Sequence, residues 1–314
     1  IEDSNLEAKA HTYLGALFWN ADKGAGAFAW LDVSTGAWTG LQSGHAEELR
    51  QWILKMLPSE LIVPDTPIAV DSLKDFPDVS LARVPYRSHF EPRRAAERLF
   101  AAQSVQDASA LGLEKSPELI QACGAIIAYL EQIQKRDPSQ LSPFRPVEKN
   151  SWLIIDEVTE KNLELFKRLD GKKGQGTLWH VMDHTRTPMG GRMLEERMRC
   201  PWRQLRKILS VQESVTWMTD RGEKLNDIRA ALDGVYDIER LSTRISLDRC
   251  QPRDMAALRE SLSAIPDVYE SVFGGSGEDA VLPSALRTLM GAWDMLEDVA
   301  QLLKRALRDE LPLQ

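Results

Sequence analysis

Two histidines are the most direct candidates for metal chemistry in this 314-residue sequence. His180 and His184 lie four positions apart, a spacing that would place both rings on one face of a helix, as zinc ligands can be. The stretch between them lacks the glutamate of the metalloprotease pattern, and no third ligand is evident. The Gly-x-Ser-x-Gly pattern that exposes a nucleophilic serine is also absent. We therefore predict packing and capping roles for the two histidines, with no catalytic residue and no metal site.

A glycine-rich stretch, "DGKKGQGT" at positions 170–177, has the composition of a phosphate-binding loop. A P-loop needs four residues between its first glycine and a Gly-Lys-Ser/Thr ending, so that backbone amides and the lysine converge on phosphate. Here Gly176 is followed directly by Thr177, without the lysine. The spacing predicts a flexible loop in which Thr177 caps a following helix.

The elements that would position such groups follow two different patterns. Up to about residue 106, short apolar runs and two amphipathic helices predict an α/β domain, residues 1–106, with a ribonuclease-H-like mixed sheet. The expected strands cover residues 13–19, 26–34, 36–44, 60–65 and 79–86, and the expected helices cover residues 46–57 and 91–103. A nuclease on this fold needs several inward carboxylates to hold divalent metal, and only Asp32 is well placed. A ribonuclease-H-like nuclease with a helical extension is therefore the less favoured alternative.

The remainder, residues 107–314, is predicted to be an all-α, multi-helix domain. Its first long helix begins at Ser116 and Pro117, and apolar residues recur at helical spacing as far as Ile133. The three cysteines are odd in number and far apart, which predicts reduced thiols: Cys123, Cys200 and Cys250.

The composition is that of an acidic globular protein, with a net charge of −8 and 43% hydrophobic residues. The first ten residues lack the features of a secretory signal, and no apolar run of about 18 residues occurs, so we expect a cytoplasmic location and no membrane partner. One stretch departs from the acidic balance, because residues 186–207 contain seven basic residues against Glu195 and Glu196. A solvated helix flank with internal ion pairs is favoured there over direct DNA contact.

The segment around that basic stretch predicts a packed helix. Thr187 and Pro188 form a helix start, and Pro201 ends the helix. Two adjacent glycines, Gly190 and Gly191, predict close approach of another backbone. We expect four apolar side chains to be buried, namely Met189, Met193, Leu194 and Met198.

Several blocks together resemble the MutS family of DNA mismatch-recognition proteins. The block "HVMDHTRTPMGGRMLEERMRCPWRQ" matches the family's D-x-T-x-T-P-M-G-x-R-x-L run at Asp183, Thr187, Pro188, Met189, Gly190, Arg192 and Leu194. The block "VYDIERLSTRISLDRCQPRDMAALRESL" matches a second family pattern at Asp237, Glu239, Arg240, Arg253 and Asp254. "LIIDEVTEKNLEL" resembles the family's T-x-x-N-L-E segment, and the turn from Asp32 to Gly36 resembles the start of its connector domain. The resemblance covers essentially the whole chain.

The resemblance implies a fragment made of the connector domain, residues 1–106, and the first part of the helical core or lever domain, residues 107–314. In this family a homodimer closes around mismatched double-stranded DNA, exchanges ADP for ATP and recruits a MutL-like protein. The sequence contains neither the family's Phe-x-Glu mismatch wedge nor its ATPase P-loop. We therefore expect a structural coupling and partner-docking segment without catalysis, and we expect ATP and magnesium only in an absent ATPase domain.

The resemblance also implies a partner site on the helix expected at residues 91–103. Ala95, Leu99 and Ala102 form its apolar stripe. The charged residues expected to project outward, and to bind the MutL-like protein, are Arg93, Arg94, Glu97 and Arg98.

Overall fold

The computed structural model describes residues 8–68, 70–76, 79–132, 138, 141–148, 151–275 and 281–308. The chain divides into two compact units. The first comprises residues 1–149 and 155–178, and the second comprises residues 150–154 and 179–314.

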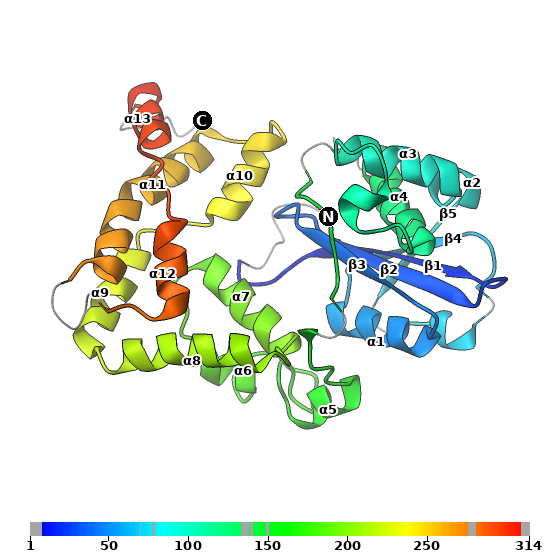
Figure 1. Ribbon diagram of the computed structural model, residues 1–314, viewed down its shortest axis with the longest axis horizontal. Coiled ribbons are helices and arrows are strands. Elements are labelled where there is room, and N and C mark those ends of the chain that lie inside the picture. Colours follow the sequence, from blue (N-terminus) through cyan, green and yellow to red (C-terminus); the bar gives the residue numbers. More distant parts are fainter. Residues whose placement is uncertain are drawn as a thin grey trace. The chain divides into compact units, whose positions relative to one another are not determined.

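The first unit is built on a mixed sheet (Figure 1). Its strands are β1 (Tyr13–Asn20), β2 (Ala25–Asp32), β3 (Trp38–Ser43), β4 (Glu60–Pro64), β5 (Ser80–Val84) and β6 (Arg145–Pro146). The strand order is β5-β4-β1-β2-β3-β6. β2 is antiparallel to both β1 and β3, whereas β4, β5 and β6 each pair in parallel with their neighbours. The five strands expected from the sequence are confirmed.

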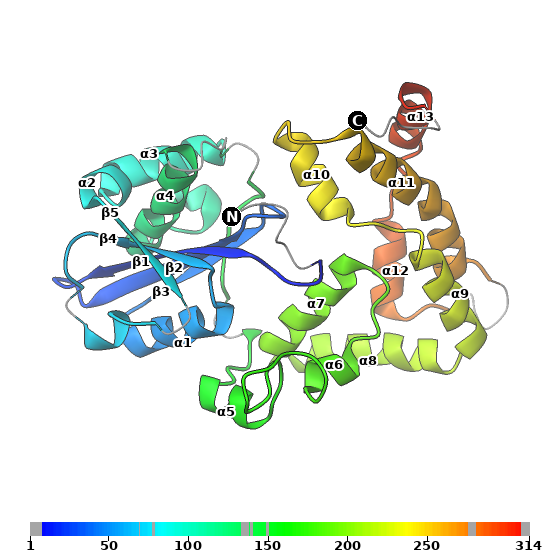
Figure 2. The ribbon, with the colours of Figure 1, turned by 180° about the vertical axis from the view of Figure 1, so that it is seen from behind.

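Both faces of the sheet are covered by helices, with α1 (Ala46–Met56) on one face and α4 (Pro117–Gln132) on the other (Figures 1 and 2). β1 and β2 are consequently buried along most of their length. This explains why both strands are continuous apolar runs rather than alternating patterns. Further elements of the unit are η2 (Asp71–Leu73), α2 (Tyr86–His89), α3 (Pro92–Ala102), η3 (Ala108–Leu111) and α5 (Glu157–Asn162).

α4 is the central helix of this unit. Twelve of its sixteen residues are buried, and it packs against β1, β2 and α3. α3 approaches closely at Gly124, where a Cβ would lie 2.7 Å from the carbonyl oxygen of Ala95. The boundary expected after residue 106 is therefore wrong for the compact units, because α4 and residues 155–178 belong with the sheet. Ile133, expected at the end of this helix, lies outside the described residues.

The second unit is helical, as expected. Its elements are α6 (Leu178–Met182), α7 (Pro188–Arg199), α8 (Leu205–Thr219), α9 (Gly222–Leu232), α10 (Ile238–Ser246), α11 (Pro252–Phe273), α12 (Ser284–Gly291) and α13 (Glu297–Ala306). α11 packs against α9, α10 and α13, while α8 packs against α9 and α12. The apolar side chains gather in small separate clusters, one of which contains Leu241, Leu258, Leu262, Ala300 and Leu303.

A short extended segment joins this helical unit from earlier in the chain. Trp152 and Trp202 form an antiparallel bridge. The amide of Leu153 donates to the carbonyl of Pro201 (2.7 Å), and the amide of Arg203 donates to the carbonyl of Ser151 (3.0 Å). Residues 151–153 are therefore held against the connection between α7 and α8.

Cys123 and Cys200 are buried, Cys250 is half-buried, and all three are free thiols. Of the helices in the described ranges, none is both long enough and apolar enough to span a membrane.

Candidate functional site

The carboxylate best placed for metal chemistry is engaged by its neighbours. Asp32 lies at the end of β2, where its side chain is hydrogen-bonded to Nδ1 of His11 (2.6 Å) and accepts from the amide (2.8 Å) and hydroxyl (2.6 Å) of Ser34. Burial acts to raise the pKa of Asp32, but the bonds with His11 and Ser34 outweigh it and lower that pKa from its ordinary value. Across the part of the chain that the structure describes, no group of three His, Cys, Asp or Glu residues could hold a metal ion. Asp32 therefore orders the turn that follows β2.

The glycine-rich loop is arranged as a tight turn. Gly171, Gly174 and Gly176 have positive φ, which favours glycine. The amide of Arg168 donates to the carbonyl of Lys172 (2.9 Å), and the Thr177 hydroxyl donates to the carbonyl of Gly174 (2.8 Å). The backbone conformation therefore explains why glycines occupy these positions, and a bound phosphate is not needed to explain them.

The start of α7 agrees with the sequence pattern. The Thr187 hydroxyl accepts a hydrogen bond from the Gly190 amide (3.1 Å), and Pro188 occupies the first helical turn. Just upstream, Asp183 accepts from the amide (3.1 Å) and hydroxyl (2.5 Å) of Thr185. Together these bonds fix the direction in which the chain enters the helix.

A buried arginine joins α7 to α10. Arg192 is 2% exposed, and its guanidinium donates to both carboxylate oxygens of Asp237 (2.6 and 2.7 Å). It also donates to Oε2 of Glu239 (2.6 Å). We call these three residues the Arg192 clamp. Burial opposes the charge, but the hydrogen bonds that Arg192 donates to both carboxylates outweigh it and raise the pKa of Arg192 above its ordinary value.

Asp237 has a second role at the start of α10. It is the N-cap residue of this helix, and Oδ1 accepts from the Arg240 amide (3.2 Å). The Arg240 side chain also lies 3.7 Å from the same carboxylate. One carboxylate therefore caps the start of α10 and also receives Arg192, so the helix start and the interhelical contact depend on each other.

Further polar contacts connect α10 to α11 and the start of α7 to the end of α9. Arg244 of α10 donates to Asp254 of α11 (2.8 Å), and Asp254 also accepts from the Gln251 amide (2.9 Å) in a capping box. Arg186, before α7, lies 3.6 Å from Asp233 at the end of α9. Arg253, another member of the matched sequence block, is exposed on α11.

The burial expected for the apolar stripe on α7 is wrong, because none of its four side chains is buried. Met193 is 53% exposed, which contradicts its expected burial, and the other three members are half-buried: Met189, Leu194 and Met198. The inward positions are taken by Gly191 and Arg192, because the helix turns its charged residue toward α10. A Cβ at Gly190 would meet side chains of Thr187 and Thr185, so its close neighbours are not another backbone as expected.

The proposed partner residues on α3 do not behave alike. Arg93 and Glu97 form an exposed ion pair (3.0 Å), and Arg94 is also exposed. Arg98 instead donates to the carbonyl of Ser88 (2.6 Å) and is only 21% exposed in its side chain. The outward orientation expected for Arg98 is therefore wrong, because its guanidinium ties α3 to α2.

A family model for MutS domain II matches residues 12–145, and one for MutS domain III matches residues 158–314. The chain belongs to the MutS family. The domain II match continues through α4, in agreement with the compact unit and not with a boundary at residue 106.

Relatives named DNA mismatch repair protein MutS align along the whole chain. The protein of Nitratidesulfovibrio vulgaris is 51% identical over 326 residues, that of Oleidesulfovibrio alaskensis is 49% identical over 323 residues, and that of Lawsonia intracellularis is 45% identical over 323 residues. Each alignment covers 99% of this chain and 36% of the relative. The chain therefore spans about a third of the length of these MutS proteins and corresponds to their domains II and III rather than to the ATPase domain.

The MutS signature residues thus come from separate sequence blocks that the fold brings together. The resemblance named Arg192, Asp237 and Glu239 without saying that they touch. Sequence reasoning did not find the contact of Gln204, whose amide donates to the Ser151 hydroxyl (3.0 Å) and ties the start of α8 to the extended segment. No helical spacing links residues 151 and 204, so the contact becomes apparent only from the fold, in which residues 151–153 pair with residues 201–203.

Proposed function

We propose that this chain is the structural coupling and partner-docking segment of a MutS mismatch-recognition ATPase, without catalysis of its own. The observation that carries the coupling role is the Arg192 clamp. Sliding α7 along α10 would strip a buried guanidinium of its counterions, a change that costs several kcal/mol, of order 3–5. The two helices therefore resist relative motion, and helices joined in this way transmit a rigid-body displacement.

We infer that the first unit is a ribonuclease-H-like connector. The support is the strand order β5-β4-β1-β2-β3, with one antiparallel strand between its neighbours and helices on both faces. Nuclease chemistry is not part of the proposal, since Asp32 is already engaged by His11 and Ser34. Binding of ATP and magnesium, contact with mismatched duplex DNA and homodimerisation are assigned by this proposal to the complete MutS protein.

A chimera tests the coupling role. In this chimera, the chain would replace the matching segment of the Nitratidesulfovibrio vulgaris protein. Two versions would be compared, one with the unaltered chain and one that carries Arg192→Met. We expect the Arg192→Met chimera to bind ATP and mismatched duplex, yet to lose about 10-fold in the mismatch-dependent change of ATP turnover, a coupling energy of ordinary size. Arg253→Met, on the exposed face of α11, is the matched control and should leave coupling intact.

Circular dichroism of each chimera would establish that it is folded before the turnover is compared. A folded Arg192→Met chimera whose ATP turnover responds to a mismatch as strongly as the unaltered chimera would contradict the coupling role.

We also propose that the exposed charges of α3 contact the MutL-like partner. Arg93, Arg94 and Glu97 project from a helix whose buried side carries Ala95 and Leu99, so they can steer a complementary surface without an apolar patch. Reversal of Arg94 and Glu97 in the chimera should weaken MutL recruitment while mismatch binding and ATP turnover persist. Unchanged recruitment in a pull-down with purified MutL would exclude this surface.

A further inference from the structure

Residues 151–153 are held along their whole length by the connection between α7 and α8, and we call them the strap. Two backbone hydrogen bonds, 2.7 and 3.0 Å long, enclose the bridge between Trp152 and Trp202. Ser151 is 5% exposed, and its hydroxyl accepts from the side-chain amide of Gln204 (3.0 Å). Each residue of the strap therefore has a partner at this connection, on the helical unit.

The strap follows closely on a strand of the sheet unit. The amide of Val147, the residue after β6, donates to the carbonyl of Gly40 in β3 (2.8 Å). Val147 and Ser151 are four positions apart, and a chain of that length spans at most about 14 Å when fully extended. A displacement of this edge of the sheet therefore pulls on the strap after little slack has been taken up.

The chain returns to the sheet unit after the strap. Residues 150–154 belong to the helical unit, whereas residues 155–178 belong to the sheet unit, although the match to MutS domain III begins at residue 158. The chain therefore passes between the two units three times, and two of these passages flank the strap. If the strap detached, the passage between residues 178 and 179 would be the remaining covalent connection. A single connection permits rotations that three connections oppose.

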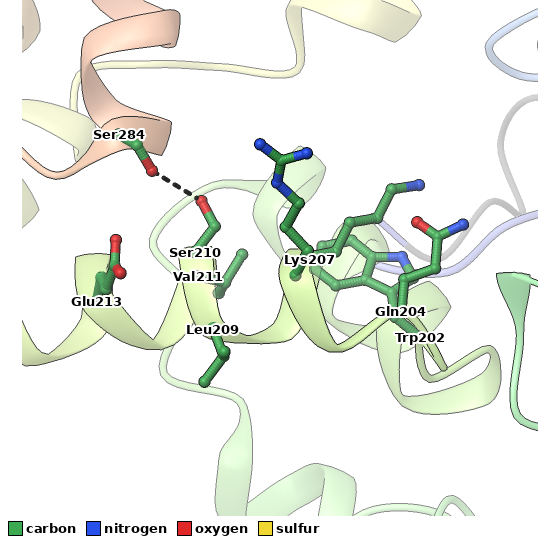
Figure 3. A pocket seen from close by; sticks show the side chains of 9 residues that line it. Trp202, Gln204, Lys207, Leu209, Ser210, Val211, Glu213 and Ser284 are labelled. Atoms are coloured by element: carbon green, nitrogen blue, oxygen red, sulfur yellow. Dashed lines mark hydrogen bonds between the residues drawn. The ribbon is translucent and has the colours of Figure 1, made fainter.

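On the helical unit, the strap is attached next to α7, the helix that the Arg192 clamp joins to α10. The guanidinium of Arg197 on α7 lies over the Trp202 ring, 5.0 Å from its centroid. Trp202 and Gln204 also border an open depression of about 620 Å³ at the start of α8 (Figure 3). This side of the connection is open, so its side chains can be changed without leaving a cavity in a core.

We propose that the strap transmits displacements of the sheet unit to the junction of α7 and α8, so that the helical unit follows the sheet unit only while the strap is paired. The bridge of the strap is a single residue pair, whereas β1 and β2 pair along eight residues. The strap can therefore open while both units remain folded, as weakly held segments do. It is a releasable connection that precedes the Arg192 clamp, and its part in mismatch repair rests on the coupling role proposed above.

The test compares the original chain with Leu153→Pro, which removes the amide that donates to Pro201. Leu153 is 50% exposed, so the change removes little buried surface, and proline favours the extended backbone that Trp152 has in the bridge. Spin labels are attached through genetically encoded azide residues at exposed positions 22 and 302, one on each unit. Pulsed electron–electron double resonance should give a distance distribution about twice as wide for Leu153→Pro as for the original chain.

A reversible crosslink separates detachment of the strap from a general loss of structure. Trp152 and Trp202 are a non-hydrogen-bonded pair, in which the Cα atoms lie about 4.5 Å apart, within the range that a disulfide spans. Trp152→Cys and Trp202→Cys, added to Leu153→Pro, should restore the narrow distribution when oxidised and lose it again on reduction. Cys200→Ala and Cys250→Ala in every version avoid competing disulfides.

Glu157→Pro is the matched control, because it places a proline at the first position of α5, where proline is compatible with a helix. This variant should keep the narrow distribution. A Leu153→Pro chain that is folded by circular dichroism, with a distribution as narrow as that of the original, would overturn the proposal. So would an original chain with a distribution as wide as that of Leu153→Pro, or a wide distribution that the oxidised crosslink does not narrow.

The chimera separates the strap from the coupling role itself. Leu153→Pro in the chimera should reduce the mismatch-dependent change of ATP turnover about 10-fold, as Arg192→Met is expected to do. If Arg192→Met reduces this change and Leu153→Pro does not, the coupling role stands and the strap is not its route. If neither variant reduces it, the coupling role fails, and the distance distributions still decide whether the strap restrains the two units.

Discussion

Burial disfavours the positive charge of Arg192, and hydrogen bonds to two carboxylates stabilise that charge. Asp237 remains only 16% exposed in its side chain, so removing the guanidinium would leave a largely buried charge without its counterion. We predict that Arg192→Met lowers the free energy of unfolding of the helical unit by about 3 kcal/mol. The free energy of unfolding of Arg192→Lys should lie between those of the original chain and of Arg192→Met. A lysine ammonium keeps the positive charge but cannot donate two parallel hydrogen bonds as a guanidinium does. Urea unfolding measures both, and an Arg192→Met chain as stable as the original would refute the assignment.

His89 makes stability depend on pH. It is 3% exposed, and burial, with a smaller effect of Arg98, lowers its pKa below the ordinary value. Because the unfolded chain takes up a proton near pH 6.5 and the folded chain resists it, the free energy of unfolding falls as pH drops through that value.

We therefore predict that the original chain loses more stability between pH 7.5 and about 5.5 than His89→Gln does. Urea unfolding at both pH values measures the difference. His184→Gln, at an exposed histidine, is the control and should follow the original chain. Identical pH dependence of the original chain and His89→Gln would count against this explanation.

Among the elements, the strands and most helices could be predicted because their signals are local. The apolar run of β1, the turn from Asp32 to Gly36 and the Thr187 cap each act within a few residues. The partners of α4 could not be predicted in the same way, since helical periodicity does not tell whether the apolar face meets a sheet or another helix. A usable signal was present, because α4 is apolar on nearly all sides, a property of helices buried in a core.

The close packing of α3 on α4 gives a sharp test of that arrangement. A methyl group at Gly124 would collide with the Ala95 backbone, which cannot move aside as a flexible side chain can. We predict that Gly124→Ala destabilises the sheet unit by about 3 kcal/mol, the upper end of the usual cost of overpacking. Gly222→Ala, at the start of α9, meets nothing within 4 Å and should be neutral or stabilising by about 0.5 kcal/mol. A Gly124→Ala chain as stable as the original in thermal unfolding would mean that α3 and α4 do not pack as described.

At the scale of the molecule, the two units interleave along the sequence. The chain contributes residues 150–154 to the helical unit, returns to the sheet unit for residues 155–178, and then completes the helices. The Arg192 clamp also joins residues that are far apart in the sequence, because Asp237 and Glu239 lie 45 and 47 residues after Arg192. Residue types in the matched blocks identify such positions, but only the fold shows that Asp237 serves both α7 and α10.

The extent of the sheet unit can be tested with fragments. A fragment that ends at residue 106 lacks α4, whose apolar residues share one core with Leu14, Ala27 and Leu31 of the sheet. Exposing that face removes much of the burial that offsets chain entropy. We predict that fragment 1–106 binds a hydrophobic dye and unfolds without a cooperative transition, whereas fragment 1–178 unfolds cooperatively in urea. Fragment 1–149 should also be cooperative but less stable, since it lacks the remaining residues of the unit. A cooperative transition and native-like near-ultraviolet circular dichroism in fragment 1–106 would restore the earlier boundary.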